Sequence, residues 1–93
     1  MWERKKEYLE WDDLLPNMQV VTIRNKNVQT ITAFNPNGLF MYMTVNEDGD
    51  VHWSNIYAAL LPDGVWYINK SNANWYKDEP NANWYKDEPK QEN

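Results

Sequence analysis

Short runs of β-branched and aromatic residues alternate with polar turn sequences through the middle of the chain. Within several runs, apolar and polar residues alternate one by one, which is the period of a strand with one buried face. Clusters rich in Asn, Asp, Gly and Pro separate the runs, and these residues favour turns. The pattern predicts five antiparallel strands, at 18–24, 28–34, the two arms of 39–57, and 65–69. Residues 58–61 are expected to extend the fourth strand or to form a short helical turn.

Residues 39–57 contain the densest apolar run, and their Asp-Gly pair is a strong hairpin signal between alternating apolar residues. A three-residue loop with Gly49 in the left-handed region would place Val45 opposite Val51 and Met43 opposite Trp53. A two-residue loop would place polar residues opposite the same two side chains. Because apolar cross-strand pairs stabilise a sheet, we predict the three-residue loop.

Residues 2–15 place Tyr8, Leu9, Trp11 and Leu15 near one stripe at helical spacing, with charged residues around the rest. Pro16 would end such a helix. We therefore predict a helix over 2–15 that covers one face or the open end of the sheet, because a small sheet needs a cover. The alternative is that this stripe binds a partner.

A chain of 93 residues is long enough for one small domain with a modest core. The pattern predicts that this domain covers residues 1–71, with the helix at 2–15 and a β body at 18–69. The expected fold is mainly β (α+β): an N-terminal helix is followed by a five-stranded antiparallel meander. We expect the meander to form an SH3-like small barrel or a curled sheet.

The C-terminal tail, residues 72–93, contains a perfect tandem repeat: NANWYKDEP occupies 72–80 and again 81–89. Trp-Tyr pairs at 66–67, 75–76 and 84–85 extend the nine-residue period back into the last predicted strand. One interpretation is replication slippage in an exposed tail. The other is a repeated linear motif that raises avidity by presenting one epitope twice. We expect the first copy to be at least partly ordered and the second to make little contact with the body.

Six Trp, six Tyr and two Phe enlarge the core that so short a chain can bury. There is no cysteine, which excludes disulfides and thiolate chemistry. No apolar run is long enough to span a membrane, and the N-terminus lacks a signal-peptide pattern. These features predict a cytoplasmic protein with no membrane partner.

The net charge is −5, and its distribution restricts the partners further. Residues 28–68 contain no Lys or Arg, whereas a nucleic-acid surface needs cations to neutralise phosphates. We therefore expect no nucleic-acid binding. The excess of negative charge instead suits a protein with a basic surface.

No group of residues indicates catalysis or metal binding. His52 is the only histidine, and no accompanying Ser, Cys or second His indicates a catalytic set. Glu47, Asp48 and Asp50 crowd one turn, but the calcium-loop pattern is absent. Asp12 and Asp13 are expected on the polar side of the helix. The sequence thus predicts no enzyme activity, no cofactor and no metal ion.

Aromatic residues without neighbouring cations are the main candidates for contact with a partner, because Trp and Tyr often anchor interfaces. The predicted partner-binding residues are Trp53, Trp66, Tyr67, Trp75, Tyr76, Trp84 and Tyr85.

These features predict a non-enzymatic protein–protein interaction module. Its specific version is a phage or mobile-element inhibitor of a host protein with a basic surface. One alternative is a carbohydrate or small-ligand binding module that stacks its ligand on Trp53, Trp66 and Tyr67. Another is a structural homo-oligomer whose tail adds as a strand to a neighbouring sheet.

Overall fold

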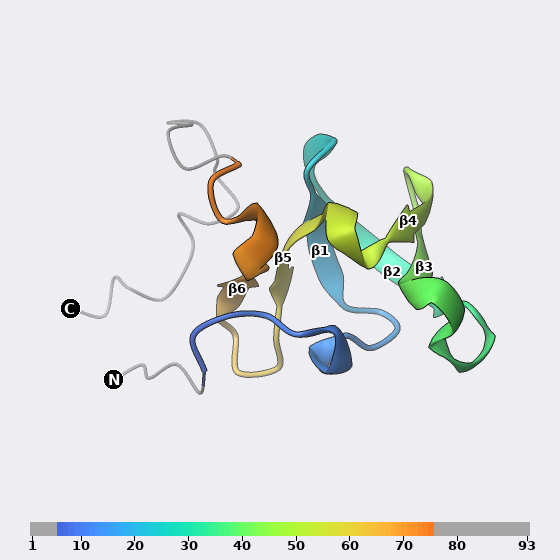
Figure 1. Cartoon of the computed structure of the whole chain (residues 1–93), viewed down its shortest axis with the longest axis horizontal. Helices are drawn as coiled ribbons and strands as arrows, with labels where there is room; N and C mark the ends of the chain where they lie inside the picture. Colours follow the sequence, from blue (N-terminus) through green and yellow to red (C-terminus); the bar gives the residue numbers. More distant parts are fainter. Residues whose placement is uncertain (1–5, 76–93) are drawn as a thin grey trace.

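The computed structural model describes residues 6–75 as a six-stranded antiparallel sheet with little helix, which confirms the mainly β prediction (Figure 1). Four 3-10 turns connect or flank the strands, and residues 6–75 contain no α-helix. The strands are β1 (Gln19–Thr22), β2 (Asn25–Phe34), β3 (Tyr42–Val45), β4 (Gly49–His52), β5 (Ile56–Leu60) and β6 (Trp66–Ile68). The turns are η1 (Trp11–Asp13), η2 (Pro36–Met41), η3 (Trp53–Asn55) and η4 (Lys70–Asn72).

The predictions of five strands and of a simple meander are wrong. The strand order is β4-β3-β2-β1-β5-β6, so the chain runs as a meander only from β1 to β4 and then returns to place β5 beside β1. The fourth predicted strand is divided by η3, and residues predicted only to extend it belong to β5. A sequence pattern cannot separate these strands, because η3 interrupts them for only three residues.

The short η3 connection requires the sheet to curl. In a flat sheet β4 and β5 would lie four strand spacings apart, or about 19 Å at roughly 4.8 Å per spacing. A 3-10 turn advances only about 2 Å per residue, so η3 cannot bridge such a distance. The ends of β4 and β5 must therefore approach each other, which the ribbon shows (Figure 1).

Strand β2 belongs to both halves of the curled sheet. Its first part pairs with β1, from Asn25 opposite Thr22 to Thr30 opposite Gln19. Its second part pairs with β3 from Ile31 onward. Register shifts interrupt both pairings, and such bulges bend strands and increase their twist. The sheet does not close: within the described residues, β4 and β6 are its two edges.

The β3–β4 hairpin confirms part of the register prediction and corrects the rest. Gly49 has a φ of +76°, in the left-handed region as predicted. However, Val45 lies opposite Gly49, and Met43 lies opposite Val51. The predicted pairing of Val45 with Val51 is wrong. Trp53, the expected partner of Met43, begins η3 and has left the strand, so Met43 pairs with Val51 and Val45 with Gly49. A shift of two residues keeps every side chain on its face, so Met43, Val45 and Val51 are still buried.

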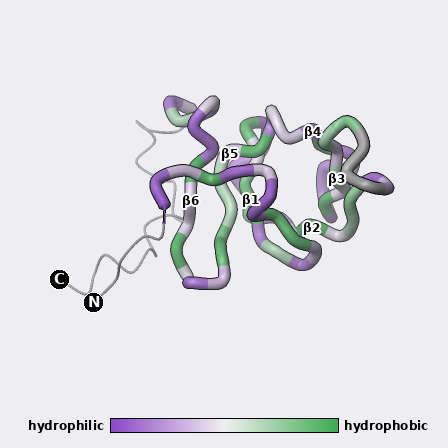
Figure 2. The backbone as a smooth tube through the Cα atoms, turned by 60° about the horizontal axis from the view of Figure 1, so that its bottom comes forward, coloured by the Kyte–Doolittle hydropathy of each residue, from purple (hydrophilic) through white to green (hydrophobic). Residues whose placement is uncertain are grey.

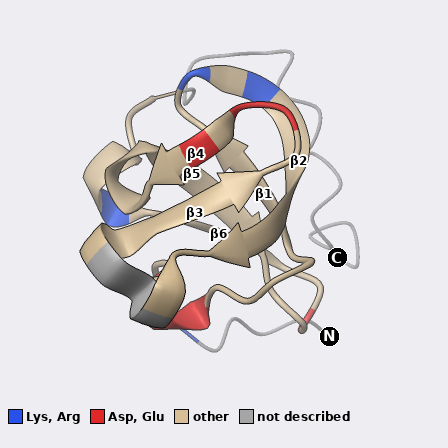
Figure 3. Ribbon diagram, turned by 90° about the vertical axis from the view of Figure 1, so that its right-hand side faces the viewer, with Lys and Arg blue, Asp and Glu red and all other residues tan. Residues whose placement is uncertain are grey.

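Gln29 ties this hairpin to the β1–β2 half of the sheet. Its buried side chain donates to the Asp48 carboxylate at 3.0 Å and accepts from the backbone N–H of Asp48 at 2.9 Å. The hydroxyl of Thr22 also donates to Asp48, at 3.2 Å. The hydrogen bond from Gln29, followed by weaker contributions from Asn25, Thr22 and Arg24, lowers the pKa of Asp48 despite partial burial. Figure 3 shows the acidic β3–β4 turn beside the basic β1–β2 turn.

The core occupies both faces of the sheet near β1, β5 and β6. Val20 and Val21 are adjacent in β1 and point to opposite faces, yet both are fully buried. The larger cluster lies inside the curl and contains Leu9, Leu14, Val20, Ile31, Met43, Val45, Val51, Ile56, Ala59, Val65 and Tyr67. The smaller cluster contains Val21, Tyr57, Ala58 and Trp66.

The predicted N-terminal helix is wrong over residues 6–15, the part that the structure describes. The backbone there has a bend at residues 7–8, a single bridge at Leu9 and the 3-10 turn η1, and it crosses the end of the sheet at β6, β5 and β1 (Figures 1 and 2). Leu9 forms a parallel bridge with Asn69, and its N–H donates to the carbonyl of Ile68 at 2.9 Å. Short helices are marginal in water, and aspartates form local bonds that compete with helix. Asp13 accepts from the N–H of Glu10 at 2.8 Å, which makes Glu10 the N-cap of η1 and interrupts any helix that would run through residue 10.

The covering role predicted for this segment is nevertheless present without the helix. Leu9 and Leu14 are buried in the larger cluster, and Trp11 packs against it. Leu15, which the helical stripe predicted to be apolar contact surface, is 54% exposed.

We expect Gly49→Val to destabilise the protein by about 1–2 kcal/mol or more, because a β-branched residue resists positive φ. Nothing lies within 4 Å of an added Cβ at this position, so the cost would come from the backbone alone. Gly49→Asn is the matched control, since Asn tolerates the left-handed region. Urea unfolding measures both variants. Equal losses for Val and Asn would show that backbone strain is not the cause.

We expect Asp48→Asn to lower the free energy of unfolding at pH 7, with a difference from wild type that shrinks under acid conditions. A carboxyl whose folded pKa is lowered stabilises the fold above its unfolded pKa, and this contribution disappears as the pH falls through the folded pKa. The window therefore lies at and below about pH 4. Urea titrations between about pH 7 and pH 3 test this. Asp50→Asn is the control, because exposed Asp50 accepts only from Thr44 among the described contacts. A difference that is constant with pH contradicts the assignment.

Candidate functional site: the Trp11 groove

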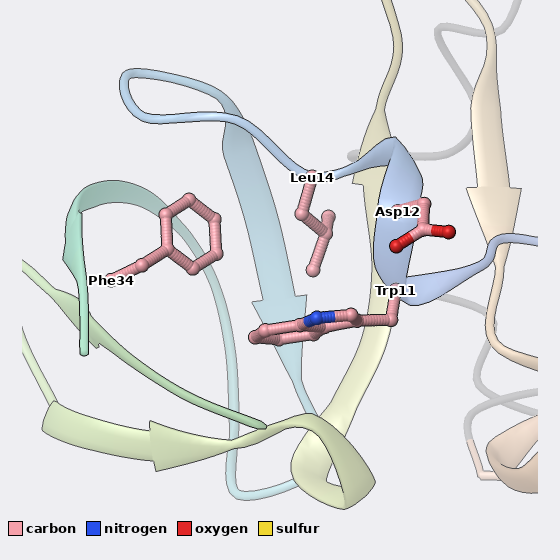
Figure 4. Close-up of a pocket in the computed structure, with 4 residues that line it drawn as sticks. All are labelled: Trp11, Asp12, Leu14 and Phe34. Carbon is pink, nitrogen blue, oxygen red and sulfur yellow. The ribbon is translucent and has the colours of Figure 1, made fainter. Parts of the chain in front are cut away.

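An open groove of about 210 Å³ lies between η1 and the end of β2 (Figure 4). We call it the Trp11 groove; Trp11, Asp12, Leu14 and Phe34 line it. In Figure 4 the Leu14 side chain points toward the Trp11 indole, and the Phe34 ring lies beyond the far end of that indole. The site therefore combines one segment before the sheet with the end of its longest strand.

Three aromatic rings from distant parts of the sequence meet here. The Trp11 and Phe34 rings lie 5.5 Å apart at 89°, and the Trp11 and Trp53 rings lie 6.0 Å apart at 72°. Edge-to-face pairs of this kind contribute about 0.5–1.5 kcal/mol beyond their buried area. All three residues also pack against the larger core cluster. The groove is consequently supported by the core rather than by a loop alone.

Ion pairing fixes the N-terminal segment that carries Trp11. The Lys6 ammonium contacts Asp13 at 2.9 Å and Glu10 at 3.2 Å. The hydrogen bond to Asp13, followed by the effects of Glu10, raises the pKa of Lys6. Asp12 lies between these two acids in sequence but has no hydrogen bond or ion pair within residues 6–75, and it is exposed. The groove thus has an unpaired carboxylate at its rim.

His52 helps to position Trp53, whose ring packs against that of Trp11. Its Nδ1 accepts from the backbone N–H of Ser54 at 3.0 Å, which caps η3. Trp53 is the first residue of η3, so this cap helps to orient the Trp53 ring. The single histidine therefore has a structural role in the described contacts. Its ring also lies 5.0 Å from that of Tyr42.

The structure disperses the residues predicted to bind a partner. Trp53 is half-buried and packs against the Trp11 ring, but it does not line the groove. Tyr67 is fully buried and donates its hydroxyl to Asp63 at 2.6 Å, and Trp66 is 6% exposed. Neither presents a ring face to solvent, so the predicted surface stack of Trp53, Trp66 and Tyr67 is absent. Trp75 is 51% exposed.

The remaining predicted contacts, Tyr76, Trp84 and Tyr85, lie outside the described residues. Sequence reasoning missed Asp12, Leu14 and Phe34 as a site and assigned Trp11 to the core. No spacing signal could have found them, because the groove joins residues 11–14 to residue 34 only after the sheet has curled. The one local hint was the Asn-Pro sequence at 35–36, which ends β2 just after Phe34.

A second exposed aromatic region lies at the start of β3. Phe40 and Met41 have φ values of +59° and +57°, which are unfavourable for residues other than glycine. Phe40 is 73% exposed and Tyr42 is 38% exposed. Strained backbone is often found at functional sites, but among the described residues no hydrogen bond from a polar side chain converges on Phe40 and Met41.

Acidic residues near the β3–β4 turn do not form a metal site in the described part of the chain. Asp48 is engaged by Gln29 and Thr22, whereas Asp50 accepts from Thr44 on the neighbouring strand. Residues 6–75 contain no group of three or more His, Cys, Asp or Glu side chains arranged to hold an ion. Over the same residues, no helix is long and apolar enough to cross a membrane.

No protein-family model matches the sequence, and comparisons with curated proteins and with solved structures found no significant match. The function must therefore be argued from the residues of the groove and from the charge of the chain.

We expect Trp11→Ala to lower the free energy of unfolding by about 3 kcal/mol, the low end of the range for a buried tryptophan. The reason is the loss of two edge-to-face contacts and of packing against the core. Urea unfolding measures the change. Phe40→Ala is the control and should differ from wild type by less than about 0.5 kcal/mol, because Phe40 is mostly exposed. If the two variants unfold alike, the N-terminal segment does not stabilise the sheet.

Proposed function

We propose that this chain is a non-enzymatic protein-interaction module whose Trp11 groove binds a short apolar segment that carries a cationic residue. The observation that carries this proposal is the unpaired Asp12 carboxylate at the rim of a groove walled by aromatic rings. Tryptophan is the residue most enriched among interface hot spots. A cation on the ligand would gain an ion pair that no described residue of the chain supplies.

The size of the groove favours an anchor side chain over a complete small molecule. Pockets for small ligands usually have volumes of about 300–1,000 Å³, whereas this groove has about 210 Å³. One or two apolar side chains of a peptide fit such a volume. The carbohydrate alternative has less support, because it relied on exposed rings at Trp66 and Tyr67, both of which are buried.

The charge of the chain favours a basic partner. The net charge is −5, and the 28–68 segment has no Lys or Arg to repel such a partner. Long-range attraction would speed the encounter and would weaken as salt is added. A phage or mobile-element inhibitor of a host protein with a basic surface is the specific version that we propose, and it rests on this charge alone.

We also propose an SH3-like organisation for the sheet, with β6 as an additional strand. Support comes from the curled sheet in which a 3-10 turn leads from an edge strand to a strand beside β1. Aromatic-lined grooves are how SH3 domains bind Pro-rich extended segments. This comparison is a fold-level analogy, and it suggests that the ligand is an extended segment rather than a helix.

Selection from a random peptide library tests the proposal. Wild-type protein should enrich peptides that combine Pro or other apolar residues with Lys or Arg. Asp12→Lys should weaken the selected peptides by about tenfold and should shift the selection toward acidic peptides. Asp50→Lys is the matched control: it makes the same charge change outside the groove and should keep the wild-type preference.

Two outcomes overturn the proposed groove. One is an equal effect of Asp12→Lys and Asp50→Lys, which would make the interaction a general charge effect. The other is a library that yields no enriched peptide with wild-type protein. In the second case, binding to a panel of oligosaccharides would revive the carbohydrate alternative.

A further inference from the structure

We infer that the second repeat unit of a neighbouring copy of this chain, centred on Trp84 and Lys86, is a ligand of the Trp11 groove. The inference rests on the proposed function, since it names one segment that the groove would take. It makes self-association a property of the module. Three observations support it.

The first observation is the chemistry of the repeat. Each unit contains the sequence Trp-Tyr-Lys, which places a large aromatic side chain two residues before a cation. The groove offers aromatic walls from Trp11 and Phe34 and an unpaired carboxylate from Asp12. The aromatic side chain of the repeat therefore matches the apolar wall of the groove, and the lysine of the repeat matches the carboxylate of Asp12.

The second observation is that the start of the first unit, residues 72–75, is attached to its own body. Asn72, its first residue, is buried and donates through Nδ2 to the carbonyls of Ser54 and Ile56, both at 2.8 Å. The N–H of Trp75 donates to the carbonyl of Asn72 at 3.0 Å, which makes residues 72–75 a turn that starts at this attachment. The Trp75 ring is 51% exposed and does not line the groove of its own chain. Residues 72–75 thus serve as an anchor.

The third observation is the length of the chain beyond that anchor. Trp84 lies nine residues after Trp75, and an extended chain of that length reaches about 30 Å. The two shorter dimensions of the molecule are 25 and 21 Å. The second unit can therefore reach a neighbouring molecule while its own chain remains folded. If each copy places its second unit in the groove of the other, one symmetric dimer contains two such contacts. The first contact then holds the second unit of the other chain close to its groove, and this effective concentration raises the affinity of the dimer.

The net charge of −5 on each copy opposes this association. Added salt screens the repulsion between whole molecules more than it screens a contact at close range. Self-association should consequently strengthen, or stay constant, from low to moderate salt. A basic partner should show the opposite dependence, so salt separates the two kinds of ligand.

Sedimentation equilibrium of full-length variants tests the inference. Wild-type protein should form a concentration-dependent dimer, and Trp84→Ala should raise its dissociation constant at least tenfold. Trp75→Ala is the matched control, because Trp75 lies in an identical sequence, and it should change the constant less than threefold.

A charge exchange tests the contact itself. Asp12→Lys and Lys86→Glu should each weaken the dimer about tenfold, whereas the double variant should recover to within about threefold of wild type. A synthetic peptide NANWYKDEP should compete with dimer formation in the wild-type protein.

The inference is overturned if full-length protein remains monomeric at millimolar concentration. This holds even if Trp84 is shielded from solvent by its own chain. It is also overturned if Trp75→Ala and Trp84→Ala weaken the dimer equally, or if the double charge variant shows no recovery. If the protein is monomeric but still selects basic peptides through Asp12, only the self-association is refuted. If it neither dimerises nor selects peptides, the proposed binding role of the groove is refuted as well.

Discussion

The three-residue connection between β4 and β5 is the constraint on which the rest of the structure depends. A sheet with these strands could lie flat only if η3 were much longer. Because it is short, the edge strand β4 must approach β5, and β2 must serve both halves of the sheet. The Gln29–Asp48 contacts then connect the two halves where β2 passes between them. Curling thus creates the enclosed core.

The same curl produces the candidate site. Trp53 lies in the short connection itself, Phe34 ends the shared strand, and Trp11 comes from a segment that crosses the open end of the sheet. None of these residues is near another in sequence. Their rings meet because the sheet bends, and the Leu9 contacts with β6 hold the crossing segment in place. The groove is therefore a product of topology, and only Asp12 adds a specific charge.

The sequence predicted the parts of this structure that depend on neighbouring residues. The strand class, the turn after Phe34 and the positive φ of Gly49 follow from local propensity. The apolar faces of Met43, Val45 and Val51 follow from alternation, which survives a register error of two residues. Three features escaped prediction because they depend on distant parts of the chain. The segment at 6–15 formed a bridge and a 3-10 turn beside β6 in place of a helix. Trp66 and Tyr67 were taken into the core. The return of β5 to β1 was not encoded in any local pattern.

The Asn72 anchor has a consequence for the evolution of the repeat. Two units with identical sequence are under unequal constraint, because Asn72 already occupies the carbonyls of Ser54 and Ile56, the second of which also accepts from Asn69. A substitution at Asn72 would disturb η4, whereas the same change at Asn81 leaves those carbonyls satisfied. Selection on folding therefore acts on one unit and spares its duplicate. The duplicate can therefore acquire new sequence without loss of folding stability at positions that the proposed groove contact does not use, such as Asn81.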